Sequence, residues 1–248
     1  MKKILIIGES CRDIFVYCHS ERLCPDIPVP ALSIVKQTEN PGMAKNVERN
    51  VKSIIDEDEC DIVTNPGWEN VTKTRYMHLD SNHMFIRVDT DHTISRIDIK
   101  KVPLGYDVIA ISDYNKGFLI EEDIKYLCEN HSNVLLDTKK ILGDWAVRAK
   151  FIKINNYEYK RSKNFISKVL EDKIIYTKGE FGAVFNGKTY PVKEKVEVKD
   201  VSGAGDSFFA ALIVKYAETG DIEKAIDFAN ECASQVVQHK GVSVVERS

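Results

Sequence analysis

The sequence predicts a three-layer α/β fold, in which helices cover both faces of a mostly parallel sheet, together with a small β-sheet lid. Segments of helical period at 121–129 and 157–170 alternate with short, continuous apolar runs. Such runs are typical of strands that are buried on both faces, and strand–helix–strand units at this spacing form right-handed crossovers in a parallel sheet. The runs are Lys3–Ile7, Asp107–Ile111, Val134–Leu136, Phe151–Ile154 and Lys173–Tyr176.

The lid is predicted from two regions that depart from this pattern. Residues 9–38 contain Pro25, Pro28 and Pro30 and a β-leaning stretch at 29–35, and residues 72–99 alternate apolar with polar side chains through 94–99. Alternation with a period of two is typical of strands with one exposed face. We expect both regions to form a separate sheet over the carboxyl edge of the main strands, where ligands bind in such folds.

The C-terminal third is predicted to be more helical. Asn186-Gly187 separates two β-leaning runs, which favours a hairpin. Helices are expected at 207–218 and 222–239, because Gly220 and Asp221 are a good C-cap and a good N-cap between them. We therefore expect one domain over residues 1–248, with a discontinuous lid.

Composition argues against several classes of protein. The chain has 248 residues, 43% of them hydrophobic and 29% charged, and its net charge of −3 gives no reason to expect nucleic-acid binding. No apolar run approaches the roughly 20 residues of a membrane span, and the N-terminal run is too short for a signal peptide. The six cysteines form no CxxC pair, so we expect reduced thiols and a cytoplasmic protein.

The segment Asp200-Val201-Ser202-Gly203-Ala204-Gly205-Asp206 opens the first C-terminal helix. Its glycines let backbone N–H groups converge on an anion, and the positive end of the helix dipole strengthens that attraction. A carboxylate beside an anion cradle is what phosphoryl transfer to a hydroxyl requires, with Asp206 as the general base. The alternative is an acidic helix cap after a tight turn.

With these elements in order, the chain resembles the ribokinase-like (pfkB) carbohydrate kinases and, among them, the kinases of D-glycero-D-manno-heptose 7-phosphate. The segment 200–206 is similar to the family's Asp-Thr-Gly-Ala-Gly-Asp signature. The other matching pieces follow in the family's order: Gly8-Glu9-Ser10-Cys11-Arg12-Asp13, Arg22-Leu23-Cys24-Pro25-Asp26-Ile27-Pro28-Val29-Pro30, Asn40-Pro41-Gly42-Met43-Ala44-Lys45-Asn46-Val47, Ser112-Asp113-Tyr114-Asn115-Lys116-Gly117, Asp137-Thr138-Lys139, Asn155-Asn156-Tyr157-Glu158 and Thr177-Lys178-Gly179-Glu180-Phe181-Gly182.

The resemblance implies transfer of the γ-phosphate of ATP to the anomeric hydroxyl of a phosphorylated sugar, with Mg²⁺ as cofactor. It leaves dependence on a monovalent cation open. It implies that Gly203, Ala204 and Gly205 present N–H groups to the phosphate while Asp206 takes the proton. The residues expected along the nucleotide are Thr177, Lys178, Gly179, Gly182 and Asn230.

For the metal, Asn155 and Glu158 match the family's Asn-x-x-Glu motif, and both would act through water. The local alternative is a helix N-cap with an acidic third position. Asp113 follows a buried strand at the same edge and is expected to add a second carboxylate.

For the sugar, the family-matched contacts are Asp13, Gly42 and Asn46. Arg22, Arg75 and Arg87 fall in the predicted lid and are candidates for a substrate phosphate, or else are solvated surface charges. Lys116 and Lys139 share that ambiguity, near the phosphates or on the surface.

Two departures from the family pattern bear on function. Only residues 54–71 stand where family members have another strand–helix–strand, and Met43 replaces a glycine that normally approaches the sugar. They keep two alternatives open: a kinase of another sugar or of a nucleoside, and a sugar- or nucleotide-binding regulator without turnover. Retention of Asp206 and Glu158 argues against the regulator.

Other expectations concern relatives and partners. No second, nucleotidyltransferase domain is expected, and a dehydrogenase is excluded because no G-x-G-x-x-G follows the first strand. A homodimer through the lid is expected, because half-exposed strands have an apolar face that a thin lid cannot bury alone.

Overall fold

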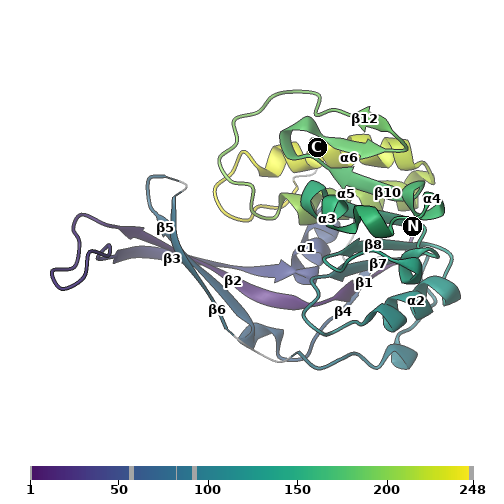
Figure 1. Ribbon diagram of the computed structural model, residues 1–248, viewed down its shortest axis with the longest axis horizontal. Helices are drawn as coiled ribbons and strands as arrows, with labels where there is room; N and C mark the ends of the chain where they lie inside the picture. Colours follow the sequence, from purple (N-terminus) through teal and green to yellow (C-terminus); the bar gives the residue numbers. More distant parts are fainter. Residues whose placement is uncertain (1, 56–58, 82, 91–93, 246–248) are drawn as a thin grey trace.

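The main sheet has eight strands in the order β12-β11-β10-β9-β8-β7-β1-β4. A computed structural model describes residues 2–55, 59–81, 83–90 and 94–245 (Figure 1). The strands of this sheet are β1 (Ile4–Gly8), β4 (Cys60–Val63), β7 (Val108–Asp113), β8 (Val134–Thr138), β9 (Phe151–Asn155), β10 (Ile174–Thr177), β11 (Ala183–Phe185) and β12 (Lys188–Tyr190). In sheet order, the strands from β4 to β10 run parallel, and β11 and β12 run antiparallel. The apolar runs predicted the parallel strands other than β4, and the Asn186-Gly187 signal predicted the β11–β12 hairpin.

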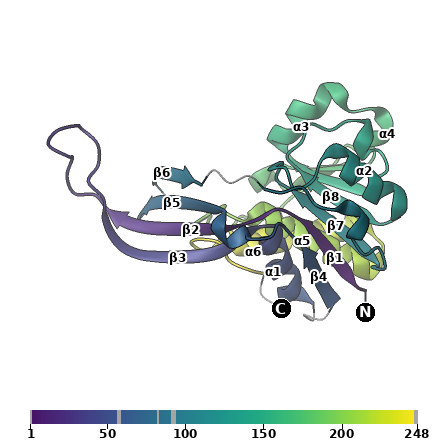
Figure 2. The same ribbon diagram turned by 90° about the horizontal axis from the view of Figure 1, so that it is seen from below.

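Alternate side chains of the buried strands separate two cores. Ile4 and Ile6 of β1 pack with one group of helices, whereas Leu5 and Ile7 pack on the opposite side of the sheet. This alternation follows from the period of two in a strand, and it explains why both faces need helices. The first face carries α1 (Ala44–Ile54), α5 (Ala204–Thr219) and α6 (Ile222–Val236), and the second carries α2 (Glu121–Asn130), α3 (Asn156–Ser162) and α4 (Lys168–Glu171) (Figure 2).

The lid is a four-stranded sheet in the order β3-β2-β5-β6. It projects from the main domain as a long twisted arm (Figures 1 and 2). A single residue separates β1 from β2, so the arm grows directly out of the carboxyl end of β1. Gly8 is required there, because a Cβ atom would lie 1.9 Å from the Ser112 carbonyl oxygen. The strands are β2 (Ser10–His19), β3 (Ser33–Met43), β5 (Thr72–His78) and β6 (Met84–Asp89).

The sequence prediction is wrong for residues 94–99. They form no strand, and Ile94 is buried in the core of the main domain that includes α2. The lid therefore ends at Asp89. The alternating apolar side chains of residues 94–99 pack against the core of the main domain and not within a lid sheet. Residues 91–93 lie outside the described part of the chain. The short 3₁₀ helix η3 (Ile99–Lys101) follows.

The predicted helix over residues 157–170 is also wrong in its continuity. It consists of α3, the 3₁₀ helix η5 (Lys163–Phe165) and α4. Ser167 caps α4 by accepting the Leu170 N–H, which starts a new helix instead of extending the first. Phe165 and Val169, expected on a buried face, are 60% and 58% exposed.

The C-terminal predictions are confirmed, except that the second helix ends at Val236, three residues before the predicted end. Asn186 and Gly187 both have positive φ (48° and 72°), as a tight hairpin turn between β11 and β12 requires. Gly220 ends α5 in the left-handed conformation, and Asp221 accepts the N–H groups of Glu223 and Lys224 at the start of α6. No helix among the described residues is long and apolar enough to cross a membrane.

Between α1 and β5, the described residues form only β4 and the 3₁₀ helix η2 (Trp68–Asn70). Strand β4 is the edge of the main sheet beside β1. The shortening of this region relative to the family stays a prediction. Two further 3₁₀ helices are η4 (Asp144–Ala146) and η6 (Gly179–Phe181).

Candidate active site

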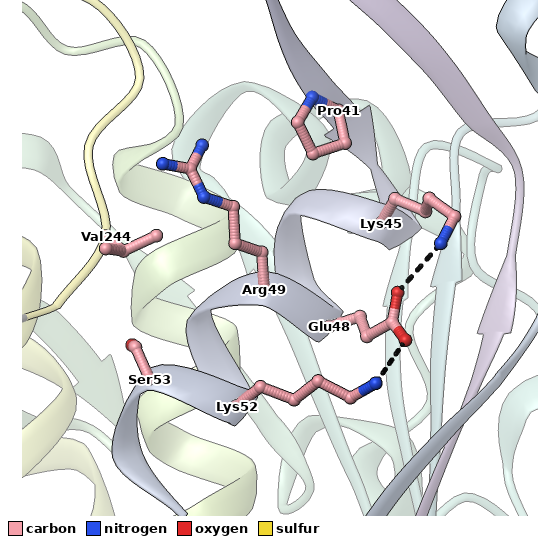
Figure 3. Close-up of a pocket in the computed structure, with 7 residues that line it drawn as sticks. All are labelled: Pro41, Lys45, Glu48, Arg49, Lys52, Ser53 and Val244. Atoms are coloured by element: carbon pink, nitrogen blue, oxygen red, sulfur yellow. Dashed lines mark hydrogen bonds and ion pairs between the residues drawn. The ribbon is translucent and has the colours of Figure 1, made fainter. Parts of the chain in front are cut away.

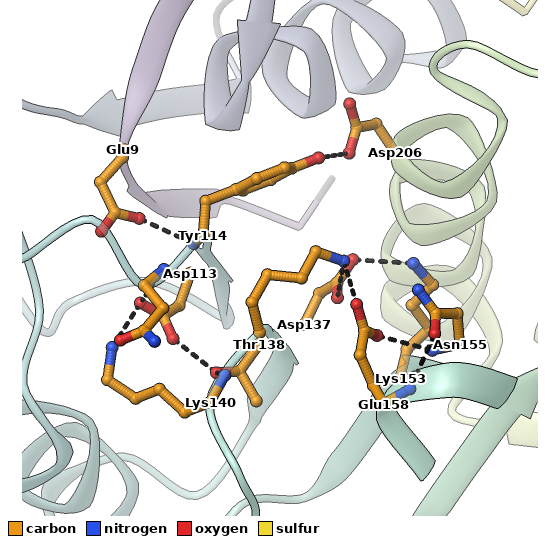
Figure 4. A network of polar contacts seen from close by, with 12 residues as sticks. Glu9, Asp113, Tyr114, Asp137, Thr138, Lys140, Lys153, Asn155, Glu158 and Asp206 are labelled. Atoms are coloured by element: carbon orange, nitrogen blue, oxygen red, sulfur yellow. Dashed lines mark hydrogen bonds and ion pairs between the residues drawn. The ribbon is translucent and has the colours of Figure 1, made fainter. Parts of the chain in front are cut away.

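The carboxyl ends of β1, β7, β8 and β9 meet the N-terminus of α5 at one edge of the main sheet. Figure 4 shows the polar side chains gathered there. This is where parallel sheets bind ligands. The residues come from positions as distant as 9 and 206, so only the strand order brings them together. They are Glu9, Asp113, Tyr114, Asp137, Thr138, Lys140, Lys153, Asn155, Glu158 and Asp206.

Asp206 is held by two hydrogen bonds from different elements. The side-chain amide of Asn46 on α1 donates to Oδ2 at 2.9 Å, and the Tyr114 hydroxyl donates to Oδ1 at 2.6 Å. Burial raises the pKa of Asp206, and the two donated hydrogen bonds oppose that rise. A fixed carboxylate with a raised pKa is a suitable proton acceptor.

The turn before Asp206 has the geometry of an anion cradle. Gly203 is the N-cap of α5 with φ of 80°, and the next N–H groups of the helix, from Gly205 onward, point toward its start. The Ala204 N–H, which we expected to face the phosphate, donates instead to the Val201 carbonyl at 3.2 Å. A Cβ atom at Gly205 would lie 3.3 Å from the Lys153 ammonium. The glycine thus lets a cation approach the helix N-terminus, and both attract an anion.

A buried ion pair that the sequence analysis missed lies beside this turn. The Lys153 ammonium contacts Asp137 Oδ2 at 2.8 Å, and both side chains are almost fully buried. The other oxygen, Asp137 Oδ1, is buried without a hydrogen-bond partner among the described residues, and Lys139 Nζ lies 3.8 Å from it. The available signal was a lone lysine inside the apolar run 151–154.

Asn155 and Glu158 form a reciprocal cap at the start of α3. The Asn155 side chain accepts the Glu158 N–H at 2.9 Å, and the Glu158 carboxylate accepts the Asn155 N–H at 2.7 Å. Glu158 also pairs with Lys139 at 2.7 Å, and the neighbouring carboxylates raise the pKa of Lys139 against the effect of burial. The helix-cap alternative is therefore realised, and it holds Glu158 facing Lys139 at the site.

The structure does not bring Asp113 together with Asn155 and Glu158. Its carboxylate pairs with Lys140 at 2.8 Å and accepts the Thr138 hydroxyl, and both charged side chains are buried. Glu9 lies nearby and accepts the N–H groups of Tyr114 and Lys116 at 2.8 Å each. Burial and the Asp113 charge raise the pKa of Glu9. These carboxylates shape the loop after β7, and the Lys116 side chain is exposed to solvent.

On the lid side, Asp13 forms a very close ion pair with Arg75. The guanidinium also lies over the Phe15 ring, 5.0 Å from its centroid. Gly42 packs against Cys11, since a Cβ atom would lie 2.8 Å from that sulfur. Asp13, Gly42 and Asn46 are thus placed along the junction of lid and main domain.

Arg22 and Met43 differ from expectation. Arg22 lies in the connection between β2 and β3, and this connection forms the outer end of the lid (Figure 1). The Arg22 carbonyl accepts the Ala31 N–H. Arg22 does not reach Asp206 of the same chain. Met43 has φ of 62° and ψ of −132°, a region that favours glycine, and its side chain is only 3% exposed. The residue at the family's glycine position therefore keeps a glycine-like backbone.

The expected nucleotide loop is a tight turn after Thr177. The Lys178 N–H donates to the Gly182 carbonyl at 2.7 Å, and both Gly179 and Gly182 have positive φ. A Cβ atom at Gly182 would lie 2.1 Å from the Tyr190 carbonyl oxygen, so only glycine fits. Asn230 is buried and donates to that same carbonyl at 2.9 Å, which ties α6 to β12.

Tyr114 and Lys73 are further site residues that sequence reasoning missed. The ammonium groups of Lys73 and Lys139 lie 5.1 and 5.2 Å from the centroid of the Tyr114 ring. Tyr114 lies within a segment that matches the family, yet no local pattern shows that its hydroxyl reaches α5. Lys73 could have been found from the alternation in β5, because it stands two residues before Arg75 and therefore lies on the same face of the strand.

A separate pocket lies on the outer side of α1 (Figure 3). Glu48 pairs there with Lys45 at 3.2 Å and with Lys52 at 2.9 Å. None of its lining residues belongs to the group around Asp206, so this pocket is distinct from the candidate active site. It is lined by Pro41, Lys45, Glu48, Arg49, Lys52, Ser53 and Val244.

A family model described as pfkB family carbohydrate kinase matches residues 120–247. The bifunctional protein HldE of Hydrogenovibrio crunogenus is 26% identical over 293 residues, which covers 99% of this chain and 61% of that protein. HldE of Helicobacter pylori strain HPAG1 is 29% identical, and the match covers 97% of this chain and 64% of that protein. The chain thus spans less than two thirds of the length of these curated relatives.

Solved structures confirm the fold. A nucleoside kinase of Methanocaldococcus jannaschii, an archaeal member of the ribokinase family, matches with a TM-score of 0.73 at 19% identity, over 97% of this chain and 93% of that one. The ribokinase of Thermotoga maritima matches with a TM-score of 0.72 at 15% identity, over 98% of this chain and 95% of that one.

Proposed function

The chain belongs to the pfkB family of carbohydrate kinases, and we propose that it transfers the γ-phosphate of ATP to a hydroxyl of a phosphorylated sugar. Heptose 7-phosphate, phosphorylated at the anomeric hydroxyl, is the proposed substrate. The observation that carries the proposal is the placement of Asp206 between Asn46 and Tyr114, directly after the glycine turn at the N-terminus of α5.

In this mechanism Asp206 accepts the proton of the sugar hydroxyl as the oxygen attacks the γ-phosphate. The N–H groups at the start of α5 and the Lys153 ammonium stabilise the negative charge on the transferred group. Asn46 and Tyr114 keep both carboxylate oxygens in place, so the base needs no reorientation. Proton acceptance by a positioned carboxylate contributes typically about 10²–10⁴-fold to rate.

The residues present also fit Mg²⁺. Asp137 Oδ1 is a buried carboxylate oxygen without a hydrogen-bond partner in the described chain, and such an atom calls for a cation or water. Asp137 and Glu158 would hold Mg²⁺ through water, and Asn155 would orient Glu158. The bound ion would neutralise charge on the ATP phosphates. Asp113 is a weaker candidate than Asp137, because Lys140 and Thr138 occupy both of its carboxylate oxygens, whereas Asp137 Oδ1 has no hydrogen-bond partner among the described residues.

Two opposed arginines support a phosphorylated substrate. Arg75 of β5 and Arg87 of β6 face one another directly in the antiparallel register. Each guanidinium already has a carboxylate partner, because Arg75 pairs with Asp13 and Arg87 donates to the two Asp89 oxygens at 2.9 and 3.0 Å. Burial together with Arg87 lowers the pKa of Arg75. A substrate phosphate between the two guanidinium groups would compete with these carboxylates and accept bidentate hydrogen bonds from both arginines.

The pair between Arg75 and Asp13 supports the same selectivity. While Arg75 neutralises Asp13, that carboxylate is occupied and a poorer acceptor for a sugar hydroxyl. A substrate phosphate would draw Arg75 away and free Asp13 to bind the sugar. A sugar without phosphate would have to break the ion pair without compensation.

The experiment that tests the function is an ADP-release assay with heptose 7-phosphate, the same heptose without phosphate, other sugar phosphates and nucleosides. We expect turnover only with a phosphorylated sugar and only with Mg²⁺. The Asp206→Asn variant controls for contaminating kinases. Turnover of a nucleoside in preference to every phosphosugar would replace this proposal with the nucleoside-kinase alternative.

We further propose a homodimer that forms through the lid. Both outer strands carry exposed apolar side chains, Ile34 at 66% on β3 and Ile86 at 54% on β6. Leu32 and Phe85 are instead partly buried against Ile14 and Val16 within the lid itself. Burial of the exposed side chains against a second lid would stabilise association at about 25 cal/mol per Å² of apolar surface.

A further inference from the structure

We propose that His19, His78 and Asp80 form a binding site for a borderline transition-metal cation such as Zn²⁺ at the end of the lid's two central strands. The three side chains each offer a ligand atom, and these atoms all lie within 4.8 Å of one another. The site is separate from the group around Asp206, because it lies at the opposite end of β2 from Ser10.

The parallel pairing of β2 with β5 creates this cluster. Cys18 is in register with His78, so His19 and His78 end adjacent strands at the same level. Their rings lie edge to face, with centroids 6.1 Å apart. Asp80 follows two residues after His78, and the Leu79 N–H donates to the Cys18 carbonyl at 2.9 Å, which fixes the turn toward His19.

The geometry of the donor atoms suits a shared cation. Nδ1 of His19 lies 3.7 Å from Asp80 Oδ2, and two ligands bonded at roughly 2.1 Å in a tetrahedral site lie roughly 3.4 Å apart. Nδ1 of His78 also faces Asp80, whose N–H donates to it at 3.2 Å. A cation on that nitrogen would replace this long hydrogen bond and bring the three donors slightly closer.

The donor chemistry selects the class of metal. Two imidazole nitrogens and one carboxylate suit Zn²⁺, Ni²⁺, Cu²⁺ or Co²⁺, whereas Mg²⁺ prefers an all-oxygen shell. With three protein ligands and partial exposure of His19 and Asp80, the fourth position would hold water. A thiol does not complete the set, because Cys18 is buried and its Sγ faces the Val16 carbonyl.

Such a cation would fasten β2 to the β5–β6 connection at the point where the C-terminal segment reaches the lid. Lys240 of that segment donates to the Leu79 carbonyl at 3.3 Å, and Leu79 stands between the proposed ligands His78 and Asp80. The alternative is an exposed ion pair between His19 and Asp80, a kind of contact that stabilises a fold very little. The ion pair accounts for His19 and the Asp80 N–H accounts for the orientation of His78, whereas a shared cation would account for the convergence of all three side chains.

The test is a Zn²⁺ titration of tag-free, reduced protein in excess Mg²⁺, against a chromophoric chelator of known affinity. We expect one Zn²⁺ per chain with micromolar or tighter affinity and a rise in melting temperature. His19→Gln and His78→Gln should each weaken binding at least tenfold, and their combination should abolish both effects. His131→Gln is the matched control, because His131 contacts the Tyr106 carbonyl in the main domain.

Two results would overturn the site. One is unchanged Zn²⁺ affinity in the folded double variant, with folding checked by circular dichroism. The other is a thiolate-to-metal charge-transfer band after Co²⁺ binding, which would assign the cation to cysteine. A Co²⁺ spectrum without that band, lost in the double variant, would support histidine and carboxylate ligation.

Discussion

The hydroxyl of Tyr114 donates a 2.6 Å hydrogen bond to Oδ1 of Asp206 and joins the loop after β7 to the first turn of α5. The carboxylate is thereby held from two elements, because the Asn46 amide reaches its other oxygen from α1. The Tyr114 ring also contacts the ammonium groups of Lys73 and Lys139, one from the lid and one from the main domain. Tyr114 is thus a positioning residue that connects the base, the lid and the phosphate side of the site.

Tyr114→Phe should shift the pH dependence of turnover. A hydrogen bond donated to a carboxylate favours its charged form, so its loss raises the pKa of Asp206 further. The acidic limb of kcat/KM against pH should therefore move to higher pH, with a roughly tenfold loss below neutral pH and a smaller loss above it. A loss that is the same at every pH would leave Tyr114 a purely structural role. Tyr106→Phe, which removes an exposed hydroxyl bonded to Asp61, is the matched control.

Asp206→Asn should abolish turnover and leave ATP affinity within a few-fold of the wild type. The amide keeps the shape of the carboxylate but accepts no proton, which corresponds to a loss of about 10²–10⁴-fold or more. Asp221→Asn, at the exposed N-cap of α6, should leave turnover unchanged. If the Asp206→Asn protein kept most of the wild-type kcat, the general-base role would be refuted.

The same substitution should raise thermal stability above the pKa of Asp206. Burial raises the folded pKa of this group, so its stabilising contribution is present at low pH and is lost as the pH rises through the folded pKa. Asn carries no charge at any pH and avoids that loss. Melting temperatures should favour Asp206→Asn near neutral pH, and the difference should shrink on acidification. A variant that is less stable at neutral pH would contradict this expectation.

Asp137→Asn and Glu158→Gln should each raise the Mg²⁺ concentration for half-maximal activity by several-fold to tenfold, with little change in sugar KM. Each removes one negative charge beside the proposed metal position. Asp113→Asn should lower stability and leave the Mg²⁺ requirement unchanged, because it leaves the buried Lys140 without its partner. Asp137→Asn should lower stability as well, because it leaves the buried Lys153 without its partner. Loss of one partner of a buried pair costs about 3–5 kcal/mol, so both variants should melt earlier than Glu158→Gln. Superimposable Mg²⁺ titrations for Glu158→Gln and wild type would reduce Glu158 to a helix cap.

Arg75→Gln should reduce discrimination in favour of phosphorylated sugars. The change removes a phosphate ligand and frees Asp13. The kcat/KM for the phosphosugar should therefore fall ten- to a hundredfold, which corresponds to about 1.4–2.8 kcal/mol of transition-state stabilisation. The kcat/KM for the unphosphorylated sugar should fall much less. Arg96→Gln is the control, since Arg96 pairs with Asp123 on α2 outside the lid. Equal losses on both substrates would indicate that Arg75 supports the lid and does not read phosphate.

A lid-mediated dimer should dissociate when charge enters its apolar face. Ile34→Asp and Ile86→Asp together should convert a dimer of about twice 28.2 kDa into a monomer in light scattering at micromolar concentration. Phe165→Asp is matched in exposure but lies on η5 of the main domain, and it should leave the dimer intact. A wild-type protein that runs as a monomer would defeat the proposal.

The sequence by itself determined the features that depend on neighbouring residues. Apolar runs marked the parallel strands, because a strand covered on both faces tolerates few polar side chains. Asn186-Gly187 and Gly203 identified their turns, because both demand positive φ. These signals are local, so they located the N-terminus of α5 and Asp206 before any contact was known. The resemblance to a family then supplied the roles of the residues.

Only the tertiary structure decided which distant residues meet. The contacts of Asp206 with Asn46 and Tyr114 span 160 and 92 residues, and they exist because β7 and α1 converge on the start of α5. The pairing of Lys153 with Asp137 likewise follows from the adjacency of β8 and β9. Alternation misplaced residues 94–99 because Ile94 finds its apolar contacts in the main core, and the pattern does not say which core receives a side chain. Sequence periodicity reports how much of a side chain is covered, whereas the partner that covers it is set by strand order and chain crossing.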